Sequence, residues 1–297
     1  MGPSAIFGVS WSVALRLGRV SNLPTVWTNV LAGTVLSGAP WAPGHVLTLM
    51  LALSLFYVAG MYFNDAFDAA YDRQHRPGRP IPSGAATASA VFGMGAALIG
   101  AGLVLLLVLG FGSGATGLRG FAGGLALTAA ILVYDIWHKG NSIGPVLMGL
   151  CRVLVYLTAA ASIAGVLPHD LLGAAAMALC YLIGLTYAAK QEDLKSPSHL
   201  WPLFFLAAPL VYALPIAGES TAGLVIFAAL LLAVIYSLFC MVRLGRADIS
   251  RVVSILIAGI CLLDALFIAG AGQLGFALLA ALGFPLTLLL QRSIPGV

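Results

Sequence analysis

Long apolar runs dominate this chain and restrict it to very few kinds of fold. Hydrophobic residues make up 61% of the sequence and charged residues only 8%, a composition typical of a membrane protein with several spans. A helix needs roughly 17 to 25 apolar residues to cross a bilayer. Runs of this kind occupy residues 21–39, 45–65, 88–111, 119–138, 143–165, 170–190, 201–217, 221–242, 252–271 and 273–291. We therefore expect an all-α polytopic membrane bundle of nine or ten transmembrane helices, built as one domain over residues 1–297.

Basic residues indicate how these helices are oriented. All 14 Lys and Arg residues except Arg119 and Arg152 fall on one side of the bilayer under this assignment. Cytoplasmic loops carry the excess of Lys and Arg in membrane proteins, so this side is predicted to be cytoplasmic. The alternation works best with ten spans, or with nine spans and a re-entrant last segment. We expect an integral protein of the bacterial inner membrane.

The positive charge does not indicate nucleic-acid binding. The net charge of +4 follows from membrane topology, and no basic face with interleaved aromatic residues occurs. Membrane lipids are the expected surroundings, and no DNA or RNA partner is expected.

Four polar residues crowd into the end of the second apolar run. Asn64, Asp68 and Asp72 are spaced four residues apart and share one helical face, while Asp65 and Asp68 are neighbours three residues apart. Like charges this close to hydrocarbon are tolerated only if cations neutralise them or water reaches them. Hard oxygen ligands that leave room for phosphate suit Mg²⁺. The cluster predicts a Mg²⁺ site, and the alternative is a solvated acidic helix end paired with the following arginines.

A basic loop follows this acidic cluster. It carries Arg73, Arg76 and Arg79. Guanidinium groups bind phosphate oxygens in a bidentate manner and neutralise the charge that builds on a departing diphosphate. Carboxylates beside such a loop at a membrane surface indicate a site for a metal and a diphosphate.

The same residues resemble a known family signature. The run Asn-Asp-x-x-Asp-x-x-x-Asp-Arg at 64–73, followed by Arg-Pro-Ile-Pro-Ser-Gly at 79–84, is similar to the first signature of the UbiA-type intramembrane prenyltransferases. Residues 19–27, which include Asn22, resemble the first helix of that family. The resemblance extends over most of the chain.

The resemblance implies a fold and a set of site residues. In that family nine helices form a ring around a central cavity open to lipid, with the polar site on the cytoplasmic face. Tyr134 and Lys139 resemble the family's Tyr-x4-Lys pair, which implies a catalytic role for both, and Asn22 is implied in substrate binding. The loop arginines and Lys139 would hold the diphosphate. The implied ligands of Mg²⁺, three of them also catalytic, are Asp65, Asp68 and Asp72, with Asn64 assisting.

The implied reaction is the ionisation of an allylic isoprenyl diphosphate. Metal and cationic side chains stabilise the leaving group, and an apolar cavity with aromatic walls shields the carbocation until a nucleophile attacks. The acceptor is expected to be aromatic or a lipid. A quinone precursor, a haem, a sugar phosphate or a lipid alkoxide would suit the same ionisation site.

The second acidic motif of the family is altered here. The family has Tyr-Ala-x-x-Asp-x-x-x-Asp, whereas residues 187–195 read Tyr-Ala-Ala-Lys-Gln-Glu-Asp-Leu-Lys, with Gln and Lys where the aspartates are expected. Tyr187 and Lys190 are predicted to contact substrate, and Glu192 and Asp193 are predicted to supply carboxylates to metal. A lysine can replace the charge of a metal ion on a diphosphate but not its coordination geometry.

This departure leaves three functions open. The altered motif, together with Leu-Met-Gly-Leu-Cys-Arg at 147–152, resembles the EboC-type branch of the superfamily. The main hypothesis is a prenyltransferase. The alternatives are a divergent isoprenoid enzyme such as a cyclase, and a non-catalytic binder or carrier of prenyl lipids.

Two charged residues lie inside predicted spans. An intramembrane arginine normally faces a cavity or a partner, so Arg152 either reaches substrate from a cavity wall or pairs with a carboxylate such as Asp135. Asp264, in the ninth span, is protonated, hydrogen-bonded to another helix or exposed to the cavity, and we expect a structural role for it.

Overall fold

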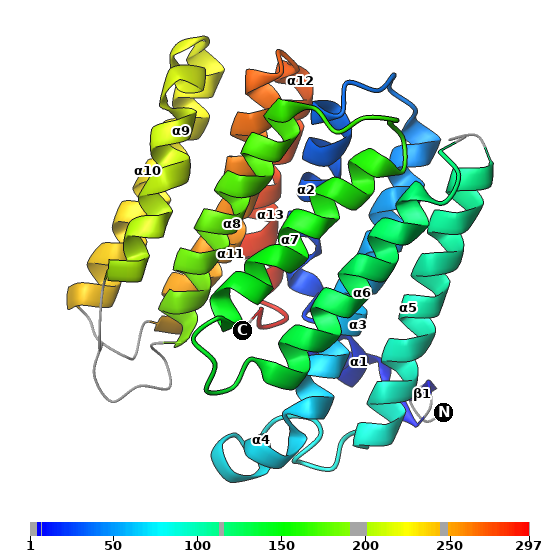
Figure 1. The fold of residues 1–297 in the computed structure, drawn as a ribbon. Coiled ribbons are helices and arrows are strands. Elements are labelled where there is room, and N and C mark those ends of the chain that lie inside the picture. The colour runs from blue at the N-terminus through cyan, green and yellow to red at the C-terminus, as the bar shows by residue number, and fades with distance from the viewer. Residues whose placement is uncertain (1–4, 7, 113–115, 191–200, 244–248, 297) are drawn as a thin grey trace.

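The architecture is a bundle of membrane-length helices with short polar segments gathered at one end (Figure 1). The computed structural model describes residues 5–6, 8–112, 116–190, 201–243 and 249–296. Within these ranges, nine helical segments are long and apolar enough to cross a membrane. They are α3 (Pro43–Phe67), α5 (Ala88–Phe111), α6 (Arg119–Trp137), α7 (Gly144–Ala161), α8 (His169–Lys190), η2 with α9 (Trp201–Leu206 and Ala207–Gly218), α10 (Thr221–Arg243), α11 (Ile249–Gly270) and α12 with α13 (Leu274–Ala281 and Gly283–Gln291). The predicted all-α membrane fold is confirmed.

The first predicted span forms a helix of less than membrane length. The apolar run covers 21–39, but α2 (Leu23–Leu36) has only 14 residues. At 1.5 Å per residue it is about 21 Å long, against a hydrocarbon core of about 30 Å. A 3-10 turn, η1 (Val20–Asn22), precedes α2, and Gly38 leaves it with a φ of +70°. α2 is nevertheless mostly buried, because it packs against α3, α7 and α11.

The last predicted span is divided between two helices. α12 ends at Ala281 and α13 begins at Gly283. Pro285 lies in the first turn of α13, where the missing N–H of proline is tolerated. Gly283 allows α13 to approach α11 closely, since a Cβ atom there would lie 2.9 Å from Cys261 Sγ. The two pieces follow one another along the bundle and together form one apolar span (Figure 1).

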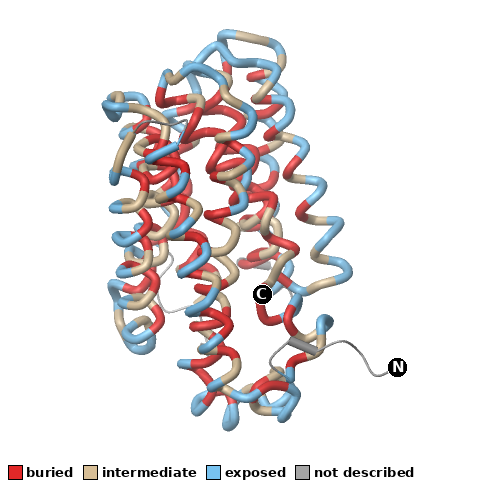
Figure 2. The backbone as a smooth tube through the Cα atoms, turned by 90° about the vertical axis from the view of Figure 1, so that its right-hand side faces the viewer, coloured by how far each residue is buried: buried red, intermediate tan, exposed pale blue. Residues whose placement is uncertain are grey.

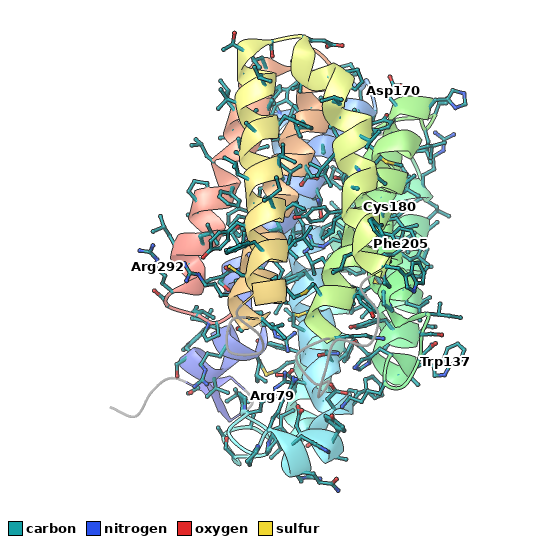
Figure 3. The ribbon with its side chains drawn as sticks, turned by 90° about the vertical axis from the view of Figure 1, so that its left-hand side faces the viewer. Arg79, Trp137, Asp170, Cys180, Phe205 and Arg292 are labelled. Atoms are coloured by element: carbon teal, nitrogen blue, oxygen red, sulfur yellow. The ribbon has the colours of Figure 1, made fainter. Side chains whose placement is uncertain are left out.

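Short elements gather at the lower end of the bundle in Figure 1. A two-stranded antiparallel hairpin, β1 (Ala5–Ile6) with β2 (Val9–Ser10), leads into α1 (Trp11–Leu17). The helix α4 (Ala69–His75) follows α3 at the same end. Figure 3 shows Arg79 and Trp137 toward this end and Asp170 toward the opposite one.

Burial follows the position of each helix in the bundle. In α11, 78% of the most apolar window is buried, because α2, α8, α10 and α12 surround it. Outer helices keep large apolar side chains exposed, as for Val108 (63%) and Val211 (71%). Figure 2 shows buried residues on the inner faces and exposed ones outside. An apolar outer surface is suited to lipid, and the protein is an integral membrane protein.

Candidate active site

Three aspartates at the end of α3 and in α4 form a buried acidic cluster. Asp65 lies in the last turn of α3, Asp68 at the junction of the two helices, and Asp72 in α4. The junction keeps helical spacing: Asp68 N donates to Asn64 O, and Asp72 N donates to Asp68 O, both at 2.9 Å. The three aspartates are only 6%, 8% and 2% exposed. Carboxylates this deeply buried need cations beside them.

Arginines neutralise two of the aspartates. Arg79 Nη1 lies 2.9 Å from Asp72 Oδ2 and 3.3 Å from Asp65 Oδ1, so the loop after α4 folds back over α3. Arg19 Nη2 lies 3.1 Å from Asp65 Oδ1. The pairing with Arg79 agrees with the alternative interpretation of an acidic helix end paired with the following loop. The burial does not agree with a solvated helix end.

Arg19, which contacts the cluster, has an unusual backbone conformation. It is the only non-glycine residue with positive φ, +42°, among those that the structure describes. This conformation costs about 1–2 kcal/mol for a residue with a side chain, and it persists where the surroundings hold it. The Tyr57 hydroxyl donates to the Arg19 carbonyl at 3.4 Å. From sequence, Arg19 belonged to the topology pattern and the first-helix resemblance, and no spacing linked it to Asp65.

Lys139 and His138 hold the third aspartate. Lys139 Nζ lies 2.8 Å from Asp68 Oδ1, and His138 Nε2 lies 3.6 Å from Asp68 Oδ2. The Lys139 ammonium is also 3.7 Å from the centre of the Tyr71 ring. Burial works to raise the pKa of Asp68, but the hydrogen bonds from His138 and Lys139 bring it below its usual value. Burial likewise works against the charged imidazole, yet the Asp68 carboxylate raises the pKa of His138.

A polar cavity of about 280 Å³ opens beside Asp65. Its walls carry four arginines and one aspartate, so it attracts an anion. Arg76 is one of these arginines, whereas Arg73 is exposed on α4. The lining residues are Arg16, Arg19, Asp65, Arg76, Gly78, Arg79, Pro80 and Pro295.

A second, largely apolar cavity of about 90 Å³ lies between α2, α3, α6 and α7. Tyr134 lines it and stacks on His138, with ring centroids 4.9 Å apart. Tyr134 therefore connects this cavity to the pair formed by His138 and Asp68. The lining residues are Val26, Leu53, Phe56, Tyr57, Gly60, Met61, Leu127, Ile131, Tyr134, Asp135, Met148, Cys151, Arg152 and Val155.

Arg152 lies in the wall of this apolar cavity. Its guanidinium donates to Asn29 Oδ1 at 2.7 Å and to Thr25 Oγ1 at 2.9 Å, both on α2. Asp135 also lines the cavity, but the hydrogen bonds of Arg152 go to α2. The pair with Asp135 that the sequence left open is not formed, and the cavity position is the one that the structure supports.

Asp264 is hydrogen-bonded to other helices, which agrees with the expected structural role. Its carboxylate accepts from Thr28 at 2.5 Å and from Asn29 at 2.7 Å, and it also accepts from the Tyr156 hydroxyl. Because Asn29 also accepts from Arg152, a polar network runs from the cavity wall to the buried face of α11.

Asn22 bonds to the C-terminal segment in this structure. Its Nδ2 donates to the Gly296 carbonyl at 2.9 Å, and its Oδ1 accepts from Gln291 Nε2 at 2.8 Å. Asn22 thereby ties the start of α2 to the C-terminal segment. Its predicted role in substrate binding remains a prediction.

The second motif is only partly described. Lys190 is the last residue of α8. It donates to the Asn141 carbonyl at 2.8 Å, so it lies against the loop between α6 and α7. Tyr187 is half-buried against the large apolar core around α8 and α11. Glu192 and Asp193 lie outside the described residues.

Different basic side chains pair with different aspartates of the acidic cluster. Arg79 holds Asp65 and Asp72, and Lys139 holds Asp68. Accordingly, within the described ranges, no three His, Cys, Asp or Glu side chains lie close enough to hold one metal ion.

The fold and this site together define an integral membrane protein in which a buried acid–base cluster adjoins an apolar cavity between helices. Residues 23–218 match the UbiA prenyltransferase family. The chain belongs to this family, which confirms the resemblance seen in its first motif.

Solved structures show the same fold. The apo structure of a UbiA homolog from Aeropyrum pernix K1 superposes with a TM-score of 0.66 at 18% identity, over 84% of this chain and 96% of that one. A UbiA homolog from Archaeoglobus fulgidus, bound to GPP and Mg²⁺, superposes with a TM-score of 0.60 at 17% identity, over 91% of this chain and 99% of that one.

Curated relatives match over a shorter stretch. The digeranylgeranylglyceryl phosphate synthase of Metallosphaera sedula is 30% identical over 99 residues, which are 33% of this chain and 34% of that protein. The matched stretch thus spans about a third of the relative's length.

Proposed function

We propose that this protein is a Mg²⁺-dependent intramembrane prenyltransferase that ionises an allylic isoprenyl diphosphate and transfers the prenyl group to a lipid alcohol. The observation that carries the proposal is the buried cluster of Asp65, Asp68 and Asp72, held by arginine and lysine beside an apolar cavity. A relative is named for the synthesis of a prenylated glyceryl phosphate, which favours a lipid over an aromatic acceptor.

The donor chemistry of the cluster fits Mg²⁺. Asp65, Asp68 and Asp72 offer hard carboxylate oxygens, and their burial beside cations shows that they need positive charge nearby. Asn64 gives its Nδ2 to Asp135, which leaves its carbonyl oxygen as the ligand group. These four residues would hold the ion once the carboxylates turn from their present cations toward it, and Mg²⁺ bound there would supply charge neutralisation for the departing diphosphate.

The cationic side chains would hold the diphosphate. Arg76 and Arg79 line the polar cavity, and Lys139 lies at the neighbouring aspartate. Arg79 and Lys139 now neutralise aspartates, so a divalent cation on those aspartates would leave both side chains available to phosphate oxygens. Arg73, exposed on α4, is placed to meet the incoming diphosphate at the surface.

The wall of the apolar cavity would shield the reacting end of the cationic intermediate. Tyr57 and Tyr134 present aromatic rings to it, and most of its wall is aliphatic. Aromatic faces attract cations, and a dry wall keeps water away from a reactive carbocation. Release of the prenyl group as a free alcohol would thereby be slowed in favour of transfer.

We place the site on the cytoplasmic side. Arg79 lies at the end of the bundle opposite Asp170 (Figure 3), and Lys139 joins it there through its contact with Asp68. The positive-inside rule assigns such an end to the cytoplasm. Water-soluble diphosphates would then enter from the cytoplasm.

The test is diphosphate release by the purified protein from geranyl, farnesyl and geranylgeranyl diphosphates, with and without Mg²⁺. A glyceryl ether phosphate and an aromatic acid serve as alternative acceptors, and Asp68→Ala is the inactive control. We expect Mg²⁺-dependent release that yields a prenyl ether of the lipid alcohol and is lost in Asp68→Ala. Turnover that survives in Asp68→Ala contradicts the proposal. Release with a cyclic product and no acceptor indicates a cyclase, and binding without release indicates a carrier.

A further inference from the structure

Asp135 is a buried carboxylate that the acid–base cluster does not use. It lies on α6 and is 4% exposed. Its Oδ1 accepts from Asn64 Nδ2 at 3.2 Å. Its Oδ2 is fully buried, and in the part of the chain that the structure describes no donor lies within hydrogen-bond distance. A buried carboxylate oxygen without a donor is costly, so it indicates a missing partner.

The position of Asp135 suggests where that partner comes from. The residue lines the apolar cavity between α2, α3, α6 and α7, where Arg152 is the other charged residue. The guanidinium of Arg152 already donates to Asn29 and Thr25. A guanidinium can only donate, so of the two charged groups in the wall Asp135 supplies the acceptor without a partner, and this acceptor requires a donor.

The cavity also restricts the kind of molecule that can supply this donor. A carboxylate repels a second anion and accepts from a hydroxyl, and the remaining wall accepts apolar groups. With about 90 Å³, the cavity is smaller than the roughly 150 Å³ that admits benzene. It has room for the hydroxyl-bearing part of a larger apolar molecule and not for a complete prenyl chain.

We propose that this cavity is the acceptor's hydroxyl subsite, in which Asp135 Oδ2 accepts a hydrogen bond from the alcohol that receives the prenyl group. The inference rests on the proposed function, because it assigns the acceptor a place within that site. Asp135 accepts a hydrogen bond from Asn64, which precedes Asp65 in the chain. The hydroxyl is therefore held next to the acidic cluster. A carboxylate at this position selects acceptors that carry a hydroxyl over those whose oxygen is alkylated.

The test measures binding of two matched probes without Mg²⁺ or diphosphate. One is a monoalkyl glycerol ether with free hydroxyls, and the other is the same lipid with those hydroxyls methylated. Dissociation constants are measured by native mass spectrometry of the purified protein in detergent. We expect the wild type to bind the free alcohol roughly tenfold more tightly, because a site built to accept from a hydroxyl rejects the analogue that lacks it.

Two variants assign this preference to Asp135. Asp135→Leu removes the acceptor and should bind both probes equally. In Asp135→Asn, the amide carbonyl is held by Asn64 and the NH₂ group faces the cavity, where hydroxyl and ether oxygens accept equally, so the preference should also vanish. Met148→Leu changes the same wall without changing a polar group, and it should keep the preference. If Asp135→Leu does not fold, Asp135→Asn decides.

Retention of the tenfold preference in a folded Asp135 variant, or its absence in the wild type, overturns the subsite. These results are independent of catalysis, since the probes need neither metal nor diphosphate. Failure of the protein to ionise any prenyl diphosphate would overturn the proposed function and leave the probe preference measurable. Turnover to a prenyl ether together with an unchanged preference in both variants would overturn the subsite alone.

Discussion

Lys139 Nζ lies 2.8 Å from Asp68 Oδ1, so the residue that follows α6 meets the junction of α3 and α4. The contact joins Lys139 of the Tyr-x4-Lys pair to the acidic motif, although the predicted spans 88–111 and 119–138 lie between them in the sequence. A cation at this point is well placed to pass from a carboxylate to a phosphate oxygen. The first prediction follows from this contact.

Lys139→Met should lower kcat/KM for diphosphate release by about 10- to 100-fold. The reason is the loss of a charge-assisted hydrogen bond to phosphate, worth about 1.5–3 kcal/mol. Steady-state kinetics on geranylgeranyl diphosphate in the presence of Mg²⁺ measure the change. Arg292→Met removes a charge from an exposed position after α13 and should leave kcat/KM unchanged. Equal kinetics for Lys139→Met and the wild type would rule out contact between Lys139 and the diphosphate.

Arg79→Gln should destabilise the folded protein by about 1–3 kcal/mol, because two buried carboxylates lose their shared cation. Thermal unfolding in detergent measures the change. If the aspartates bind Mg²⁺, adding Mg²⁺ should raise Tm more in Arg79→Gln than in the wild type. Arg73→Gln, at an exposed position on α4, should change the unfolding free energy by less than about 0.5 kcal/mol. A similar Tm for both variants would show that Arg79 does not stabilise the cluster.

Asp264→Ala should lower the unfolding free energy by about 1–3 kcal/mol, since Thr28, Asn29 and Tyr156 lose their common acceptor inside the bundle. Thermal unfolding in detergent measures the change. Asp170→Ala, at the exposed start of α8, is the matched control. A wild-type Tm for Asp264→Ala would show that the network does not contribute to stability.

Gly33→Ala should destabilise the contact between α2 and α7 by about 1–3 kcal/mol. A Cβ atom at Gly33 would lie 2.7 Å from the Tyr156 carbonyl oxygen, which is backbone and moves only with its helix. Gly44→Ala, in the first turn of α3, meets nothing within 4 Å and should be neutral or slightly stabilising. Comparison of the two Tm values in the same detergent is the measurement. Equal Tm values would show that the close contact between α2 and α7 does not contribute to stability.

Several features of the site could be predicted from sequence because they are local. Asn64, Asp68 and Asp72 share a helical spacing, and that spacing continues through the junction of α3 and α4. The basic loop that ends at Arg79 follows within one short helix, so its return to the cluster is a short-range event. Arg152 and Asp264 were recognised because charge inside an apolar run requires a partner or a cavity.

Other features depended on which helices become neighbours. Arg19 meets Asp65 across 46 positions of the chain, and Asn22 is held by the C-terminal segment. The sequence offers Asp135 as a partner of Arg152, whereas the structure links it to Asn64 and leaves its other oxygen buried without a donor beside a cavity.

The sequence by itself determined the membrane class and the acidic motif, because hydrophobic length and helical spacing are both properties of a single helix. The resemblance of the first motif indicated the family. Only the tertiary structure decided which cation faces each aspartate and which carboxylate is left without a donor. Those outcomes depend on the packing of α2, α3, α6 and α7 against one another. No local spacing within any one of these helices encodes that packing.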